Sequence, residues 1–274
     1  MKRRHFIGVA CGGATGGLVS NRSLAAPRLA WQPDGEGSVA RLGVLTPTFD
    51  PVPESEAWAM APRGVSIHGS RVLTRRGDAQ SFAEPPNVDT AVELLAAVNP
   101  RAILSAWTSS SYFLGPEGDE ALRLRLEARA PGVPIVLAAV AASAALRALN
   151  VHRVAVVHPP WFSEETNDRG RDYFKRGFEV VSCARITPLR TFAEVSPGEV
   201  YDWVKVNVAR RADAVLIAGN GLRAVGVIEA LEAALGKPVL TANQVTFWQA
   251  LQVARVTARI DRYGQLFRRN AAQR

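Results

Sequence analysis

Cysteine is scarce in this chain of 274 residues, which contains only Cys11 and Cys183. Because Cys11 falls in an N-terminal segment that we expect to be removed, the mature chain would hold one thiol and no internal disulfide. Histidine is also scarce, at four residues. No group of histidine, cysteine, aspartate and glutamate has the spacing of a metal site, and no Gly-x-Ser-x-Gly elbow is present. These absences argue against a metal centre and against a serine hydrolase.

The sequence also lacks an apolar run long enough to span a bilayer. Its first residues instead combine Lys2-Arg3-Arg4, a mildly apolar stretch over 6–19, and the small residues Ser23-Leu24-Ala25. The arginine pair followed by His-Phe-Ile resembles a twin-arginine export signal. We predict a signal peptide over 1–25, a linker over 26–38, and a soluble protein exported to the periplasm or the exterior, with no membrane association after cleavage.

A strong basic patch is missing as well. Without residues 1–25 the chain keeps 29 basic and 25 acidic residues, so the net charge of +8 falls to +4. The arginines are scattered and no aromatic residues alternate with them, which argues against nucleic-acid binding. The mild positive charge is compatible with a small anionic ligand.

One pattern of elements occurs twice in what remains. The apolar runs within 100–115 and 212–222 each end in a loop of small polar residues, Thr108-Ser109-Ser110-Ser111 in one copy and Gly219-Asn220-Gly221 in the other. A helical pattern, a second short strand and another helix follow each loop. Strands and helices alternate through the chain, which predicts an α/β protein with mostly parallel sheets flanked by helices.

We expect the two copies to form two pseudo-symmetric lobes with a ligand cleft between them. The predicted lobes comprise residues 39–149 with 243–274, and residues 150–242. Because the loops follow the carboxyl ends of parallel strands, both can face the cleft. Both also precede helices, whose free N–H groups favour an anion. The Thr108–Ser111 loop is therefore either an oxyanion cradle or a simple helix cap.

The Gly-Asn-Gly loop formally fits the G-x-G-x-x-A dinucleotide fingerprint. That motif belongs in the first βα unit, with an acidic residue about twenty positions later. Here the loop lies late in the chain, and the following strand ends in Leu240-Thr241-Ala242-Asn243. We therefore predict no dinucleotide site.

Two further strand ends carry polar groups. The first strand ends in a proline-containing loop that includes Pro47, Thr48 and Asp50, and this loop either joins the ligand site or merely ends the strand. His158 ends a later strand and is the histidine best placed to face the cleft, although a plain loop histidine is the alternative.

Several of these segments together resemble the aspartate/glutamate racemase superfamily, in the branch of maleate cis-trans isomerase and arylmalonate decarboxylase. The similarity extends from about residue 41 to residue 267. The segments that carry it are 108–115, 148–155, 213–222, 236–239, 247–250 and 263–267.

The resemblance implies a two-lobed fold and a carbanion or enediolate formed beside a carboxylate, without a metal or organic cofactor. In that family, cysteines of the cleft move the proton or attack the substrate. The two family cysteine positions fall on Trp107 and Gly219 here. The resemblance gives Cys183 no catalytic role, so we expect it to be buried and structural.

The anion pocket of the family is better matched. The resemblance places Thr108, Ser109 and the backbone N–H of Asn220 around the substrate carboxylate, within the Gly219–Gly221 loop, and it places Pro47 and Thr48 on the wall. The tyrosine donor of the family falls on Trp161 or Phe162, and neither has a hydroxyl group.

Two hypotheses follow. The first is an isomerase or lyase for a small mono- or dicarboxylate, in which His158 or Asp50 replaces the thiol as acid or base. The second is a non-catalytic, exported carboxylate-binding protein on the same scaffold. The sequence leaves open both the ligand and a homo-oligomeric state.

Overall fold

The computed structural model describes residues 35–75, 78–191, 194–258 and 260–272, with the backbone alone for 269–272. The predicted signal peptide and most of the predicted linker lie outside the described residues. Within them, no helix is long and apolar enough to cross a membrane.

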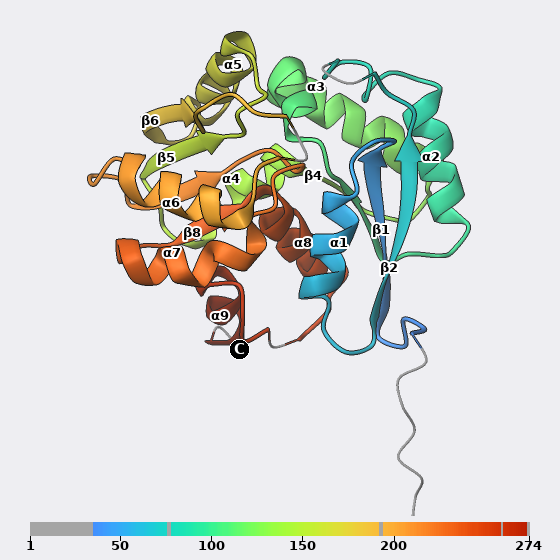
Figure 1. Cartoon of the computed structure of the whole chain (residues 1–274). Helices are drawn as coiled ribbons and strands as arrows, with labels where there is room; N and C mark the ends of the chain where they lie inside the picture. The colour runs from blue at the N-terminus through green and yellow to red at the C-terminus, as the bar shows by residue number, and fades with distance from the viewer. Residues whose placement is uncertain (1–34, 76–77, 192–193, 259, 273–274) are drawn as a thin grey trace, which may run out of the picture. The chain divides into compact units, whose positions relative to one another are not determined.

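Two four-stranded parallel sheets form the framework (Figure 1). The first has the strand order β2-β1-β3-β4 and contains β1 (Ala40–Pro47), β2 (Val65–Val72), β3 (Ala102–Ser105) and β4 (Ile135–Leu137). The second has the order β6-β5-β7-β8 and contains β5 (Arg153–His158), β6 (Glu179–Arg185), β7 (Ala214–Ile217) and β8 (Val239–Thr241). The matching order confirms the predicted α/β fold with two pseudo-symmetric halves.

Helices follow the strands along the chain. They are α1 (Val52–Met60), α2 (Asn87–Ala96), α3 (Thr108–Arg129), α4 (Ala138–Ala148), α5 (Glu164–Lys175), α6 (Pro197–Asn207), the 3-10 turn η1 (Val225–Val227), α7 (Ile228–Leu235), α8 (Ala242–Val253) and α9 (Gln265–Ala272). Helix α3 is kinked at Gly115, where φ is 69° and Pro116 follows. Ser163 caps α5 by accepting a hydrogen bond from the backbone N–H of Thr166 at 3.1 Å.

The central strands are buried along nearly their whole length and contain few polar residues, because helices cover both faces of each sheet. Helices α4 and α8 pack against each other between the two sheets (Figure 1). One core cluster includes Val44 of the first sheet and Val156 and Leu216 of the second. The predicted boundaries of the two lobes stay a prediction, because this core runs through both.

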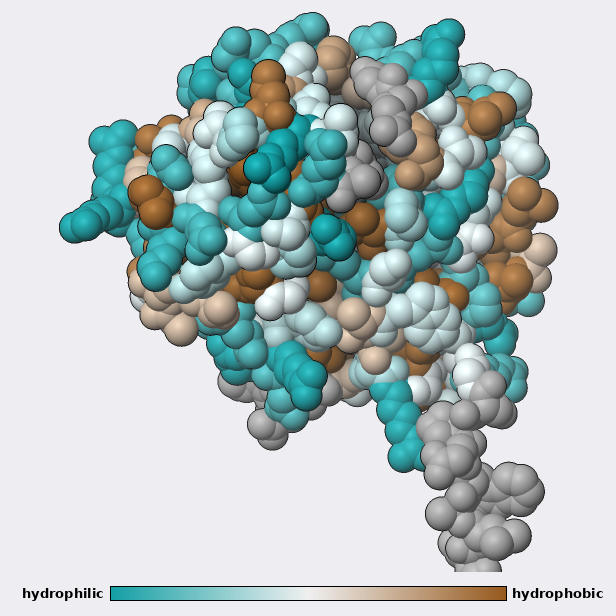
Figure 2. Space-filling view, viewed as in Figure 1, coloured by the Kyte–Doolittle hydropathy of each residue, from teal (hydrophilic) through white to brown (hydrophobic). Residues whose placement is uncertain are grey.

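The strand order reverses at the same place in each sheet. Strands β1 and β3 are central in one sheet, and β5 and β7 are central in the other. The loops after such neighbouring strands diverge and leave a crevice, which is where open α/β sheets bind ligands. On the face shown in Figure 2, hydrophilic residues dominate and hydrophobic residues lie in small separate patches. The crevice is therefore the natural place to look for a site.

Candidate active site

A cavity of about 460 Å³ lies at the carboxyl ends of the four central strands. The first half of the chain contributes the predicted residues Pro47, Asp50, Thr108 and Ser109 to its wall. The second half contributes Trp161, Gly219, Asn220 and Gly221. The structure thus brings together eight of the ten residues that the sequence analysis named.

The other two are placed differently. Thr48 is exposed and does not belong to the cavity wall. His158 does not face the cleft as expected, because its fully buried side chain points from the end of β5 into the packing between α3 and α5. Its side chain therefore has no access to a ligand in the cavity.

The N-terminus of α3 presents several donors at the cavity. Thr108, Ser109 and Ser110 form the first turn of this helix, and first-turn N–H groups have no carbonyl partner within their own helix. Thr108 does not direct its donors into the cavity, however. Its backbone N–H and its hydroxyl both donate to Oδ1 of Asn220, at 2.9 and 2.6 Å.

A chain of buried amides continues from Asn220. Its Nδ2 donates to Oδ1 of Asn243 at 2.8 Å, and Nδ2 of Asn243 donates to the Asn220 carbonyl at 2.8 Å and to Oε2 of Glu56 at 2.7 Å. The other oxygen of Glu56 accepts the N–H groups of Ala224 and Val225. Burial raises the pKa of Glu56 to about 7, although these hydrogen bonds act to lower it. The sequence analysis did not find Glu56 or assign Asn243 a role.

Asp50 is the carboxyl group of the cavity wall. It is 4% exposed, and its Oδ1 accepts the backbone N–H of Val52 at 3.0 Å. Burial raises its pKa to about 7, while the Val52 hydrogen bond and the positive charge of Arg71 pull the pKa down. A carboxyl group with such a pKa can give or take a proton near neutral pH.

Aromatic rings form much of the remaining wall, namely Phe49, Trp107, Trp161 and Phe162. The Trp107 ring lies edge-to-face against Phe49, with 5.7 Å between the ring centroids, and it also contacts Phe82. Its Nε1 donates to Oγ of Ser109. The cavity therefore combines polar donors with an apolar, aromatic lining.

Gly219 has a backbone conformation that suits only glycine, with φ at 95°. A Cβ at this position would also lie 2.8 Å from Cγ and Cδ of Pro159. A side chain at residue 219 is therefore disfavoured by both backbone strain and a steric clash.

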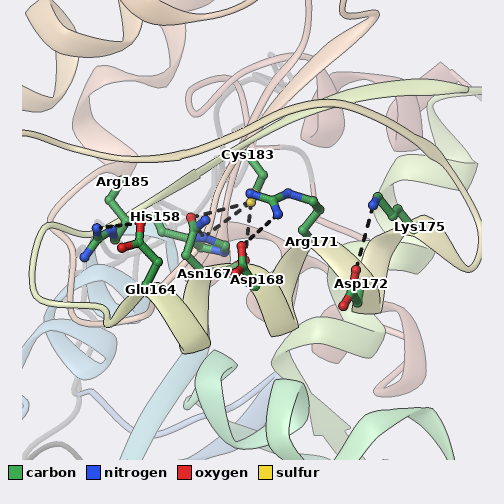
Figure 3. Close-up of polar contacts among 9 residues, drawn as sticks. All are labelled: His158, Glu164, Asn167, Asp168, Arg171, Asp172, Lys175, Cys183 and Arg185. Atoms are coloured by element: carbon green, nitrogen blue, oxygen red, sulfur yellow. Dashed lines mark hydrogen bonds and ion pairs between the residues drawn. The ribbon is translucent and has the colours of Figure 1, made fainter.

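His158 and Cys183 belong to a separate cluster (Figure 3), in which His158 is buried and Cys183, which we expected to be buried, is half-buried. Nδ1 of His158 donates to Oδ1 of Asn167 at 2.9 Å, so its Nε2 accepts from the Tyr112 hydroxyl at 3.0 Å. Burial lowers the pKa of His158 to about 4, which keeps the ring neutral at pH 7.

The thiol of Cys183 lies 3.5 Å from the Asn167 carbonyl and 3.7 Å from Nδ1 of His158. Burial raises its pKa to about 11, which disfavours the thiolate. Cys183 is the cysteine among the described residues, and it does not line the cavity. The described residues also contain no group of three or more potential metal ligands.

Comparison with known proteins agrees with this architecture. The family model of arylmalonate decarboxylase matches residues 63–267. The arylmalonate decarboxylase of Bordetella bronchiseptica is 25% identical over 235 residues, which cover 81% of this chain and 97% of that protein.

Solved structures show the same fold. The maleate isomerase Iso of Pseudomonas putida, a cysteine-to-alanine variant crystallised with maleate, superposes with a TM-score of 0.73 at 22% identity, covering 83% of this chain and 97% of that one. A cysteine-to-serine mutant of the Nocardia farcinica maleate cis-trans isomerase, with a covalently bound succinylcysteine intermediate, gives 0.76 at 19% identity, covering 84% and 98%.

These matches confirm the resemblance to the maleate isomerase and arylmalonate decarboxylase branch of the aspartate/glutamate racemase superfamily. The family model covers well over half of the chain. The chain therefore belongs to the arylmalonate decarboxylase family.

Proposed function

We propose that this protein is a cofactor-independent isomerase or lyase that acts on a small carboxylate, with Asp50 as the proton-transfer group. The observation that carries the proposal is the Asp50 carboxyl on the cavity wall, with a pKa raised to about 7. Proton transfer is most efficient when the pKa of the acid or base is close to the working pH. Family membership supports the reaction class.

The chemistry is a proton exchange at the carbon beside a carboxylate. In a decarboxylation, the bond from that carbon to a departing carboxylate breaks and CO₂ leaves. The electron pair spreads into the remaining carboxylate as an enediolate, and neutral Asp50 then donates its proton to the carbon. In a racemisation the Asp50 carboxylate removes a proton from that carbon, and the electron pair spreads into the substrate carboxylate as an enediolate. The enediolate then turns its other face to Asp50, which returns the proton there.

The enediolate needs hydrogen-bond donors that are already in place. The first-turn N–H group of Ser109 on α3, and the amides of Asn220 and Gly221, are the groups that we assign to this task. The four aromatic rings of the wall favour an aryl or other apolar substituent on the substrate, because they offer a large apolar contact area.

A thiol mechanism finds little support in this chain. The Nocardia isomerase forms a succinylcysteine, whereas Trp107 and Gly219 occupy the positions that we align with the family cysteines. The conformation of Gly219 leaves no room for a side chain. His158, our other candidate for the acid or base, is buried elsewhere. Asp50 is therefore the group that we favour.

The alternative is an exported carboxylate-binding protein without catalysis. It is favoured by the lack of a cysteine among the described residues of the cavity wall, since a binding site needs only the donors and the aromatic rings.

Proton NMR of the mature protein in D₂O separates the two functions. The protein is incubated with phenylmalonate, methyl(phenyl)malonate, maleate, phenylacetate, aspartate and glutamate, and the signals of the α-protons are followed. The proposal expects loss of carboxylate or deuterium exchange at the α-carbon for at least one compound. Line broadening of a ligand without any turnover would contradict catalysis and support the binding protein.

A further inference from the structure

The side chain of Asn220 occupies the donors of Thr108. Its Oδ1 accepts hydrogen bonds from both the backbone N–H and the hydroxyl of Thr108, at 2.9 and 2.6 Å. The family resemblance placed Thr108 among the residues around a substrate carboxylate. An amide oxygen and a carboxylate oxygen accept the same hydrogen bonds. The protein's own amide therefore stands where a ligand oxygen would be held.

The orientation of this amide is fixed from both ends. A backbone N–H can only donate, so Oδ1 of Asn220 must face Thr108. Nδ2 of Asn220 then donates to Asn243, and Asn243 donates in turn to the carboxylate of Glu56. Asn220 is 3% exposed and Asn243 is 6% exposed, so neither amide exchanges these partners for water at low cost. The arrangement is a built feature rather than a loose surface contact.

We propose that Asn220 is a specificity-determining residue that withholds the two Thr108 donors from the cavity, so that a bound carboxylate makes no hydrogen bond to Thr108. This inference rests on the proposed function only in assuming that the cavity takes a carboxylate. Ligand oxygens then use the backbone amides of Ser109, Asn220 and Gly221, and only ligands that fit beside the Asn220 side chain are accepted.

We expect Thr108→Val to have different effects on carboxylate affinity in the wild-type protein and in the Asn220→Ala variant. In the wild-type protein, Thr108→Val removes a hydroxyl that binds Asn220, so carboxylate affinity changes by less than about twofold. Asn220→Ala frees both donors, and affinity rises roughly tenfold, the change that one added hydrogen bond of about 1.4 kcal/mol gives. In the Asn220→Ala background, Thr108→Val then removes the part of this gain that the hydroxyl supplies, because valine keeps the backbone N–H. Alanine is suitable because Asn220 is not among the residues with positive φ.

The test is a double-mutant cycle of these variants, measured by isothermal titration calorimetry with phenylacetate and phenylmalonate. Asn220→Asp keeps the side-chain size but adds a negative charge, and it should weaken binding of both probes. Asn87→Ala, an exposed asparagine on α2, is the matched control and should change nothing. Circular dichroism checks that each variant is folded.

Three results would overturn the inference: a roughly tenfold loss of affinity for Thr108→Val in the wild-type background, an unchanged affinity for Asn220→Ala, or no binding of either probe to any variant. If Asn220→Ala does not fold, the amide resonance of Thr108 in the wild-type protein decides. The chemical shift of the Thr108 amide should not change when phenylacetate is added, while the chemical shift of the Ser109 amide should change. The reverse pattern contradicts the inference. Because the cycle measures binding alone, a protein without turnover leaves it valid, and turnover does not rescue it.

Discussion

The two halves of the molecule share one strand order but supply different chemistry to the cavity. The loops after β1 and β3 bring Asp50 and the first-turn amides of α3. The loops after β5 and β7 bring the rings of Trp161 and Phe162 and the Gly219–Gly221 turn. At the end of β5, His158, which the sequence analysis expected to face the cleft, is instead buried in the protein interior.

The difference teaches that a repeated fold need not carry a repeated site. Racemisation uses a proton-transfer group on each face of the substrate, which a symmetric pair of loops would provide. In the described part of the wall, Asp50 is the only carboxyl group, and the opposite half has no cysteine or histidine in the lining. We therefore expect protonation from one face only.

The largest difference between the two halves should appear when the carboxyl group of Asp50, which the first half contributes, is removed. Asp50→Asn keeps the size of the side chain and should lower kcat by about 10²–10⁴-fold, because the proton donor is lost. Ligand affinity should change far less. The D₂O NMR assay measures the rate. Glu54→Gln is the matched control, since Glu54 also contacts Arg71 but lies outside the cavity wall. A kcat within threefold of wild type for Asp50→Asn would refute its role.

The second prediction concerns the histidine of the second half. His158→Gln should lower the free energy of unfolding by about 2–4 kcal/mol, because buried groups of Tyr112 and Asn167 lose well-placed partners. Urea denaturation measures this change, and kcat of the folded fraction should remain near wild type. His152→Gln, an exposed site, should leave stability unchanged. A large loss of kcat at full stability would restore His158 as an acid or base.

The third and smallest effect is the pH dependence of the wild-type protein. As a proton donor, Asp50 must be neutral, and its pKa is raised to about 7. Decarboxylation should therefore be constant below pH 7 and fall about tenfold per pH unit above it. Deuterium exchange that starts with Asp50 as a base should show the opposite slope. A profile without an inflection near pH 7 would mean that another group transfers the proton.

Local signals in the sequence predicted most of the fold. Apolar runs that end in Gly-Asn-Gly or in consecutive serines mark buried strands and the turns after them, and these signals do not depend on distant residues. Helix α1 escaped prediction because its segment Val52–Met60 mixes buried and polar positions without a clear stripe. A buried glutamate such as Glu56 looks like any surface residue in the sequence.

The site was predictable only in part. Thr108 and Asn220 could be named from their loops, yet the hydrogen bond between them joins positions 112 residues apart. Which groups a side chain meets is decided by tertiary packing, and the same holds for the direction of His158. The aromatic wall had no local signal beyond the presence of the aromatic residues themselves.

The amide chain from Glu56 to Thr108 has a consequence for how the cavity can change. Three of its hydrogen bonds run in one direction, from the Thr108 N–H through the side-chain amides of Asn220 and Asn243 to the carboxyl group of Glu56. Glu56 lies on α1 and is not part of the cavity wall. The orientation of the Asn220 amide is thus set from both ends: with a donor at position 56, the two amides could not satisfy both that donor and the N–H of Thr108, so one hydrogen bond of the chain would be lost.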